Sequence, residues 1–309
     1  LWVEPTFYAI IYSVFLGHLV CLIYGIWLER DIWQPQLKID WLEIKELLSF
    51  GMPYVPTFLL IWLLQGMDKI AIKQFSDFQE LGLYNAAFKL VAVINVAKVG
   101  FIDFWIPTSL EHFEKNKDDR GFYARMALMV SLIAIILSLG VLAASPLLIN
   151  FLGAEYREAL YIMPFLLFVP IMNLFSELTG RGIGFMKKTK FNMYASFFAV
   201  VVNLGLNYAL VPSWGAVGAA TATAVAYYVF FVSKTFFSQR LFHVPFPLLK
   251  MNVSVLLMGL LSGFLVGTQP GHILFIALPL LLAIGVVALY HRGNDLLVLQ
   301  KSLYKPILA

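Results

Sequence analysis

The sequence has little charge and almost no cysteine. Charged residues make up 13% of its 309 residues and hydrophobic residues 61%, whereas soluble domains average about 25% and about 45–50%. The single cysteine, Cys21, excludes an intrachain disulfide and a thiolate metal cluster. Together with a mean hydropathy of +0.82, this composition indicates an integral membrane protein.

Motifs for soluble catalysis are absent as well. No Gly-Lys-Ser/Thr phosphate loop occurs, so we expect no ATP hydrolysis by this chain. The five histidines are scattered, and no two have ligand spacing on one helix. The net charge of +4 is explained by basic loops and predicts no nucleic-acid partner. We therefore expect no cofactor, no metal and no enzymatic activity.

The apolar runs have the length of membrane-spanning helices. A helix needs about 20 apolar residues to cross a bilayer, and no alternating pattern of a membrane barrel appears. The sequence predicts an all-α integral membrane protein, a polytopic helical bundle. Its nine expected spans lie at residues 5–28, 48–72, 83–107, 122–144, 160–186, 191–211, 217–237, 248–268 and 273–290.

A polar linker separates the first two spans. Within it Leu37, Trp41, Ile44 and Leu48 fall on one helical face, and the charged residues lie largely elsewhere. This pattern is typical of a helix that lies on the membrane surface. A plain soluble linker helix is the alternative.

Lysine and arginine are distributed unequally between alternate loops. One set of loops holds only Lys73 and Arg157, with Lys69 at its border. Because basic loops stay in the cytoplasm, we expect the linker and the C-terminal tail there and the start of the chain outside. The basic set is Arg30, Lys38, Lys45, Lys115, Lys117, Arg120, Arg125, Lys187, Lys188, Lys190, Lys234, Arg240, Lys250, Arg292, Lys301 and Lys305.

The beginning of the chain predicts a fragment. It starts at Leu1 rather than at methionine and enters an apolar helix by Pro5. The first span is too long for a signal peptide and lacks a basic start and a small-residue cleavage site. We expect an odd number of spans before it, because the chain would start outside.

The stretch from Asn203 to Tyr227 is the most informative one. A span with Asn203 and Asn207 leads through Leu-Val-Pro into a span that begins Gly-Ala-Val-Gly-Ala-Ala. A short Pro/Gly turn leaves little outside the bilayer, and small residues allow helices to approach closely. A Lys-Lys-Thr-Lys run at 187–190 lies one span earlier, where a cytoplasmic loop is expected.

These motifs resemble the C-terminal half of bacterial oligosaccharide flippases, the Wzx-type polysaccharide transporters of the superfamily that also holds MATE drug exporters. Two further segments are similar to that family, FGMPYVPTFLLIWLLQGMDKIAI at 50–72 and LGLYNAAFKL at 81–90. Lys69 stands where the family usually has arginine, and Phe88 where it usually has tyrosine.

The resemblance implies a MATE-like fold, in which a cytoplasmic linker joins two six-helix lobes and two extra helices follow. Residues 1–28 would be the last helix of a truncated N-lobe and residues 29–47 the linker with its amphipathic helix. Residues 48–237 would form the six-helix C-lobe, residues 248–290 the two appended helices and residues 291–309 a cytoplasmic tail.

The resemblance also implies a function. Undecaprenyl-diphosphate-linked oligosaccharides would be flipped across the bacterial cytoplasmic (inner) membrane by alternating access, for O-antigen, capsule or exopolysaccharide biosynthesis. The implied partners are this lipid-linked oligosaccharide, membrane lipids, a polysaccharide polymerase and a chain-length regulator.

Three other functions are weighed against it. A MATE-like cation-coupled drug exporter should have an acidic cavity rather than one that bears lysines. A membrane glycan polymerase should have a long outer loop with catalytic groups, but the longest outer loop expected here, 145–159, is short. A structural scaffold would have no reason to keep charges in its spans.

Charges within the spans are the candidate site residues. Each costs roughly 2.5–3.5 kcal/mol at a helix centre, so they must face protein or water. Asp68 and Lys69 lie near the outer boundary, where we expect them to snorkel. The remaining candidates are Lys89, Lys98, Asp103, Glu177 and Arg181.

One span carries a polar stripe. Asn85, Lys89 and Asp103 fall within about 40° of one another at 100° per residue, and Lys98 points nearly opposite to Lys89. A lysine that faces a cavity could bind a diphosphate. An interhelical ion pair with Asp103 or Glu177 is the alternative for either lysine, and we place Lys98, the deeper one, in the cavity.

Two further polar sets have i, i+4 spacing. Glu177 can neutralise Arg181 within one helix, or the pair can serve gating or substrate binding, because the glycines at 180, 182 and 184 make this end flexible. Asn203 and Asn207 share a face as well. They either form interhelical hydrogen bonds or line the substrate cavity.

Overall fold

The computed structural model describes residues 7–30, 40–149, 153–268 and 273–291. The chain divides into two compact units, Leu1–Leu48 and Ser49–Ala309. The linker residues 31–39 and the tail beyond residue 291 lie outside the described residues. The predictions made for them, including the placement of Leu37 on the amphipathic face, therefore stay predictions.

The first unit contains α1 (Phe7–Leu28) and most of α2 (Trp41–Gly51). The α1 helix is apolar throughout, as a membrane span requires. The α2 helix starts after Asp40, whose Oδ1 accepts the N–H of Leu42 at 2.8 Å, as an N-cap residue does. Trp41 and Leu48 on the predicted apolar face of α2 are exposed.

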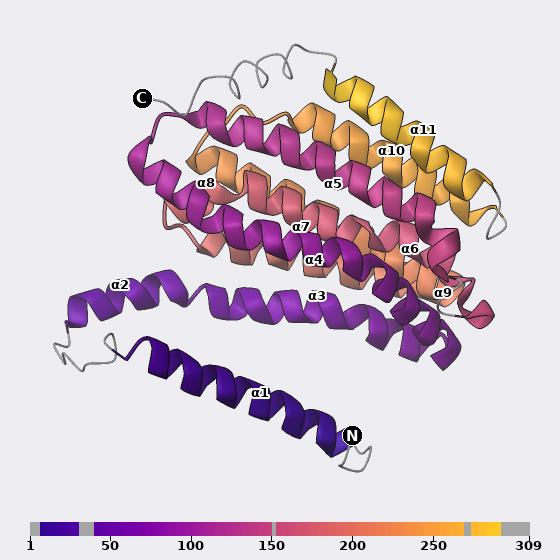
Figure 1. Ribbon diagram of the computed structural model, residues 1–309, viewed down its shortest axis with the longest axis horizontal. Helices are drawn as coiled ribbons and strands as arrows, with labels where there is room; N and C mark the ends of the chain where they lie inside the picture. The colour runs from indigo at the N-terminus through magenta and orange to yellow at the C-terminus, as the bar shows by residue number, and fades with distance from the viewer. Residues whose placement is uncertain (1–6, 31–39, 150–152, 269–272, 292–309) are drawn as a thin grey trace. The chain divides into compact units, whose positions relative to one another are not determined.

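The second unit is a bundle of helices joined by short connections (Figure 1). Two of the long helices begin where acidic residues cap them, since Asp77 Oδ1 accepts the N–H of Glu80 and Asp119 Oδ1 that of Phe122. The helices are α3 (Tyr54–Phe75), α4 (Phe78–Lys115), α5 (Arg120–Leu148), α6 (Ala159–Leu166), α7 (Phe168–Thr179), α8 (Arg181–Phe185), α9 (Lys190–Leu241), α10 (Leu248–Val266) and α11 (Leu274–His291), with a 3-10 turn at Ala154–Tyr156.

The prediction of an all-α polytopic membrane protein is confirmed. Eight helical segments among the described residues are long and apolar enough to cross a membrane, and no strand occurs in that part of the chain. One of the eight is α9, which has 52 residues. It corresponds to the two predicted spans 191–211 and 217–237.

The α9 helix folds back on itself at Gly215, whose φ of 51° and ψ of −132° are not helical. Asn203 donates a hydrogen bond to Thr223 Oγ1 at 3.2 Å, although a straight helix would place residues so far apart in sequence about 30 Å apart. The N–H of Ala216, which starts the second half, is bound by Glu80 Oε2 at 2.8 Å. The Pro/Gly turn predicted between two spans is therefore this kink.

The most buried helices are α6 and α7, at the centre of the second unit. Pro164 and Pro170 interrupt the hydrogen bonding of this segment, which divides into α6 and α7 near Leu167. The α9 helix packs against both α3 and α7, and α11 packs along α5. On the latter contact the hydroxyls of Ser131 and Tyr290 share a hydrogen bond of 3.0 Å.

An aromatic cluster joins several helix ends at one end of the second unit. Phe185 of α8 stacks on Phe113 of α4 with ring centroids 4.3 Å apart, and it also contacts Tyr123 of α5 and Phe242 after α9. The opposite end holds the kink of α9 and the start of α4, which Glu80 connects. The basic loops after α4 and α8 therefore lie at the same end of the unit.

Candidate functional site

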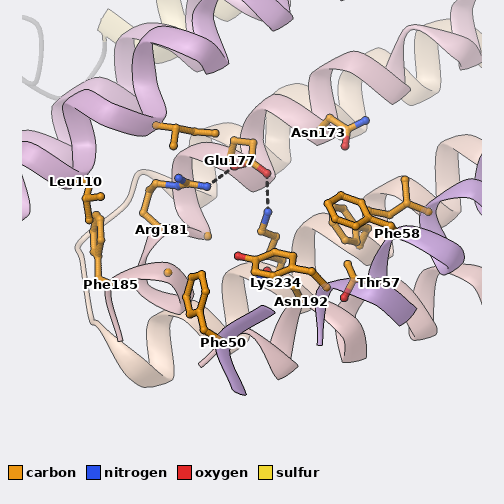
Figure 2. Close-up of a pocket in the computed structure, with 16 residues that line it drawn as sticks. Phe50, Thr57, Phe58, Leu110, Asn173, Glu177, Arg181, Phe185, Asn192 and Lys234 are labelled. Atoms are coloured by element: carbon orange, nitrogen blue, oxygen red, sulfur yellow. Dashed lines mark hydrogen bonds and ion pairs between the residues drawn. The ribbon is translucent and has the colours of Figure 1, made fainter. Parts of the chain in front are cut away.

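Two cavities in the second unit are lined by charged and amide side chains, and Asn173 lines both. The larger has a volume of about 460 Å³ and is shown in Figure 2; the smaller has about 260 Å³. The charged and amide residues of the larger cavity are Asn173, Glu177, Arg181, Asn192 and Lys234. Those of the smaller are Gln65, Asp68, Lys69, Asn95, Lys98 and Asn173.

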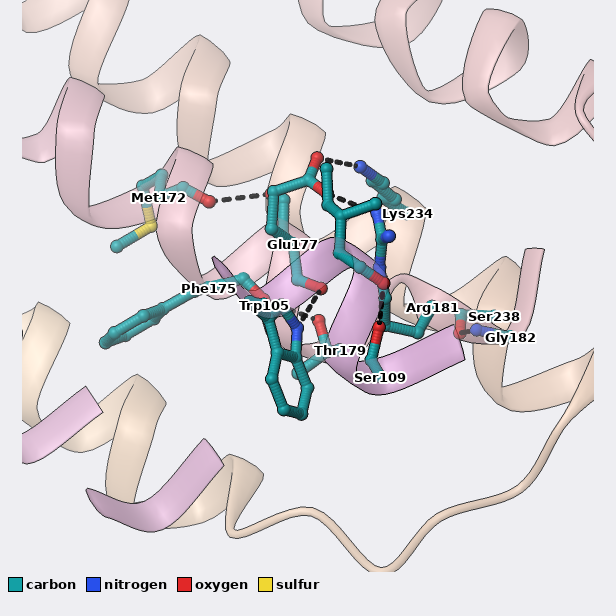
Figure 3. Close-up of polar contacts among 12 residues, drawn as sticks. Trp105, Ser109, Met172, Phe175, Glu177, Thr179, Arg181, Gly182, Lys234 and Ser238 are labelled. Carbon is teal, nitrogen blue, oxygen red and sulfur yellow. Dashed lines mark hydrogen bonds and ion pairs between the residues drawn. The ribbon is translucent and has the colours of Figure 1, made fainter. Parts of the chain in front are cut away.

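An ion cluster centres on Glu177 of α7 in the larger cavity (Figures 2 and 3). Its Oε1 accepts a hydrogen bond from Lys234 Nζ of α9 at 2.7 Å, and its Oε2 accepts one from Nη2 of Arg181. The predicted pairing of Glu177 with Arg181 is confirmed, but it joins α7 to the first residue of α8 instead of lying within one helix. The cluster carries two cations and one carboxylate, so it keeps one positive charge.

The structure corrects the predicted position of Lys234. Its position in a basic loop was inferred by counting charges, but it lies within α9 and is only 6% exposed. Its apolar neighbours in sequence, Phe230, Phe231, Phe236 and Phe237, were the available signal. A lysine in such a run must find a carboxylate when the run is buried, and Glu177 is that carboxylate.

Two of the three glycines near this cluster have a packing role instead of the expected flexibility. A Cβ on Gly180 would lie 2.6 Å from Cε of Lys234, so the lysine reaches Glu177 only past a glycine. A Cβ on Gly182 would lie 2.8 Å from Oγ of Ser238, which accepts the N–H of Gly182 at 3.1 Å (Figure 3). Gly184 meets no atom within 4 Å.

A buried carboxylate network lies beside the smaller cavity and corrects another prediction. Asp68 of α3 was expected to snorkel at the outer boundary, but it is 1% exposed. Tyr84 donates to its Oδ2 at 2.5 Å and Thr223 donates to the same atom; Asn203 and Asn207 donate to Oδ1 at 3.1 and 2.9 Å. Four donors replace the hydration of this carboxylate, which makes its burial tolerable.

Asn203 and Asn207 therefore form the interhelical hydrogen bonds that were one of their two interpretations. They connect α9 to α3 through Asp68 and connect the two halves of α9 through Thr223. Neither residue lines the two cavities.

Lys98 of α4 lines the smaller cavity and an adjoining apolar one. It forms no ion pair with Asp103 or Glu177, because Glu177 is bound to Arg181 and Lys234. No hydrogen bond of its ammonium group occurs within the described ranges. Lys69 of α3 lines the same cavity and is exposed.

The predicted polar stripe on α4 does not converge on either cavity. Asn85 donates to the carbonyl of Leu81 in its own helix at 2.9 Å. Lys89 and Asp103 are exposed, and neither lines the two cavities. Of the four candidates on α4, only Lys98 does so.

Unpaired polar atoms are concentrated at the larger cavity. Four buried side-chain nitrogen or oxygen atoms in the described part of the chain have no hydrogen-bond partner, and each such atom costs about 1–3 kcal/mol. Two of the four, Arg181 Nε and Asn192 Oδ1, belong to residues that line the larger cavity. The others are Ser196 Oγ and Asn207 Oδ1.

Metal ligation has no basis in the residues that the structure describes. Among them no three His, Cys, Asp or Glu side chains are grouped so that they could hold a metal ion. The chemistry available in the two cavities is therefore ionic and hydrogen-bonding recognition.

The chain is similar to curated proteins over most of its length. It is 25% identical over 280 residues to the probable low-salt glycan biosynthesis flippase Agl15 of Haloferax volcanii, with 87% of this chain and 58% of the relative covered. It is 24% identical over 251 residues to the teichuronic acid biosynthesis protein TuaB of Bacillus subtilis, with 80% and 50% covered. The chain thus spans about half the length of the curated relatives it matches. No solved structure matches it.

A family model described as polysaccharide biosynthesis protein matches residues 2–161, just over half of the chain. The match includes α1, α3, α4 and α5, and therefore Asp68 and Lys98. The chain belongs to this family of polysaccharide biosynthesis proteins, which is a polysaccharide flippase family.

Proposed function

We propose that the full-length protein flips oligosaccharides linked to undecaprenyl diphosphate from the cytoplasmic to the outer leaflet of the bacterial cytoplasmic membrane, by alternating access. The family and the relative named as a flippase support this class of activity, and the relatives named for glycan and teichuronic acid biosynthesis support a glycan cargo. A diphosphate with attached sugars needs such a protein, because it cannot cross about 30 Å of hydrocarbon unaided.

The position of Lys98 is the observation that carries this proposal. Its ammonium group lies within the membrane span α4 beside a cavity, and the carboxylates of Asp68 and Glu177 are bound to other residues. A lysine in a span without a structural partner is costly, and an anionic substrate would offset that cost. We assign Lys98, together with Lys69, to the diphosphate.

The neutral polar residues of the same cavity suit this role. Gln65, Asn95 and Asn173 can donate hydrogen bonds to phosphate oxygens from their amide groups. They would replace part of the hydration shell that a diphosphate loses on leaving water. Phosphate is the chemistry that a lysine and several amide donors recognise together.

A cation-coupled drug exporter fits this cavity less well. Its cargo would need an available carboxylate, but the carboxylate of the smaller cavity, Asp68, is saturated by four donors. The larger cavity keeps one positive charge after Glu177 is paired. Neither cavity thus offers an unpaired carboxylate to a cationic cargo.

The remaining parts of the proposal follow from the flippase function. The chain would act as a transporter without catalysis, with a polysaccharide polymerase and a chain-length regulator as partners in the same membrane. Residues 48–237 would form one six-helix lobe of the transporter, and α10 and α11 would be the appended pair.

The test is a flipping assay with the full-length protein in proteoliposomes and a labelled lipid-linked oligosaccharide. Lys98→Ala should lower the rate at least about tenfold, since a charge-assisted contact of roughly 1.5–3 kcal/mol is lost, and Lys98→Arg should keep part of the activity. Folded protein in the membrane should be unchanged.

Lys73→Ala is the matched control, because Lys73 is an exposed lysine of α3 outside both cavities. An equal loss for Lys89→Ala and Lys98→Ala would move the substrate contact to the other side of α4. Loss of folded protein in parallel with activity for Lys98→Ala would make Lys98 structural and remove the main support of the proposal.

A further inference from the structure

The larger cavity differs in chemistry from the one at Lys98. One part of its wall is aromatic, and the polar part contains both a donor and an acceptor without partners (Figure 2). Its volume of about 460 Å³ lies within the range of about 300–1,000 Å³ that is usual for small-molecule sites. The aromatic residues are Phe50, Tyr54, Phe58, Phe185 and Phe230.

The two unpaired atoms define what the ligand must offer. Arg181 Nε can only donate a hydrogen bond, and Asn192 Oδ1 can only accept one. Sugar hydroxyls do both, whereas phosphate oxygens only accept. Glu177 also cancels one of the two cations, so the cavity is less suited to a doubly charged group than its arginine and lysine suggest.

We propose that the larger cavity binds a pyranose ring of the glycan, an inference that rests on the proposed function. One ring hydroxyl would accept from Arg181 Nε, and another would donate to Asn192 Oδ1. The C–H faces of the ring would pack against the aromatic wall, where Tyr54 and Phe58 stack with centroids 6.0 Å apart. Small-molecule sites typically combine buried apolar area with a few directed hydrogen bonds.

Asn173 connects this site to the phosphate site. It lines both cavities, so the two cavities are adjacent at this side chain. In a lipid-linked glycan the diphosphate is bonded to the first sugar, which is the arrangement that two adjoining cavities require. The first sugar would therefore lie beside Asn192 while the diphosphate lies beside Lys98.

The experiment compares two probes on the purified full-length protein in nanodiscs, a lipid-linked oligosaccharide and undecaprenyl diphosphate without sugar. Asn192→Ala should weaken binding of the glycosylated probe roughly three- to tenfold, as expected for one neutral hydrogen bond. It should leave the sugar-free probe unchanged. Phe58→Leu, which keeps apolar volume but removes the aromatic face, should act in the same direction.

Protein stability gives a second readout. Asn192→Ala removes the unpaired amide oxygen and also the amide nitrogen, and Asn192 has a side-chain hydrogen bond with Tyr54. Its melting temperature should therefore fall no further than that of Tyr54→Phe, which loses that hydrogen bond alone. Asn116→Ala is the control, because Asn116 is exposed at the end of α4 and lines neither cavity.

Equal weakening of both probes by Asn192→Ala, or no weakening of either, would overturn the sugar site. No change with Asn192→Ala would mean that water alone satisfies these atoms. Absence of binding of both probes to the unmodified protein would instead contradict the proposed function itself, so the two failures are distinguishable.

Discussion

Asp68 shows at the scale of one residue how a membrane protein tolerates a carboxylate. Its two oxygens accept four hydrogen bonds from α4 and from both halves of α9, and it is 1% exposed. All four partners donate to the carboxylate in this arrangement, so both of its oxygens are hydrogen-bonded although the group is buried. Asp68 thus ties three helical segments together.

This arrangement predicts the effect of Asp68→Asn. The new amide nitrogen would replace one carboxylate oxygen that accepts two of these hydrogen bonds, so one or two buried donors lose their acceptor at about 1–3 kcal/mol each. We expect a lower melting temperature and less folded protein, measured by fluorescence-detected size exclusion on heating.

Asp118→Asn is the control, since Asp118 is exposed in the turn before α5 and should change the melting temperature little. A melting temperature unchanged by Asp68→Asn would show that the four hydrogen bonds contribute little to stability.

The ion cluster around Glu177 shows how buried cations are tolerated as well. Pairing with two cations explains how Arg181 and Lys234 are both kept in spans, and the glycine at 180 is required so that the lysine stem passes. Breaking a buried pair by removing one partner costs about 3–5 kcal/mol, and less here because Glu177 and Arg181 are each about a fifth exposed. The cluster is thus structural, while Arg181 Nε stays available.

Among the helices, α9 owes its folded-back shape to the kink at Gly215. Gly215 has a φ of 51°, in the region that favours glycine, and a Cβ there would lie 2.7 Å from Glu80 Oε2. That carboxylate accepts a hydrogen bond from the N–H of Ala216. At the start of the second half of α9 this donor has no partner within the helix. The turn thus needs glycine for both conformation and space.

Gly215→Ala should therefore destabilise the protein by about 1–3 kcal/mol from backbone strain, with an added cost from the contact with Glu80. The measurement is the melting temperature together with the yield of folded protein. We expect both to fall.

Gly205→Ala is the matched control in the first half of α9, where a Cβ would meet no atom within 4 Å. It should be neutral or slightly stabilising, because alanine favours a helix over glycine. Equal behaviour of the two variants would mean that α9 does not depend on the conformation at 215.

At the scale of the whole molecule, the loops divide by charge between two ends. The loops after α4 and α8 are basic, and the cluster around Phe185 brings them together. At or next to them lie Lys115, Lys117, Arg120, Lys187, Lys188 and Lys190. The kink at Gly215 and the start of α4 form the opposite end. Basic loops stay on the cytoplasmic side, which predicts the orientation of the second unit.

Single cysteines in a Cys21→Ala background test this orientation. Cysteines at Lys117, Lys188 and Arg240 should be protected from an impermeant thiol reagent in intact cells, and those at Glu155 and Ser213 should be labelled. Gly271, a further predicted outer position, lies outside the described residues. Permeabilised cells, in which all sites should react, are the control. Labelling at Lys188 but not at Ser213 would reverse the topology.

The membrane character, the helices and the family follow from the amino-acid sequence. Apolar length and Pro/Gly punctuation are local properties, so the spans and the turn near Gly215 could be predicted from neighbouring residues alone. The motif at 203–227 pointed to the flippases, although the family model matches residues 2–161 and so rests on a different part of the chain. The pairing of Glu177 with Arg181 was also predictable from their spacing of four residues, although the helix breaks at Gly180 between them.

Which polar side chains contact one another depends on how the helices pack, and the sequence does not show this packing. Asp68 looked like a boundary residue and Lys234 like a loop residue, because the sequence does not show which helices become neighbours. Their partners come from other helices: Asn203 of α9 binds Asp68, and Glu177 of α7 binds Lys234. The two cavities and the unpaired atoms of Arg181 and Asn192 depend on the same packing. A buried polar group is fixed by its partners across the fold, and these lie far away in the sequence.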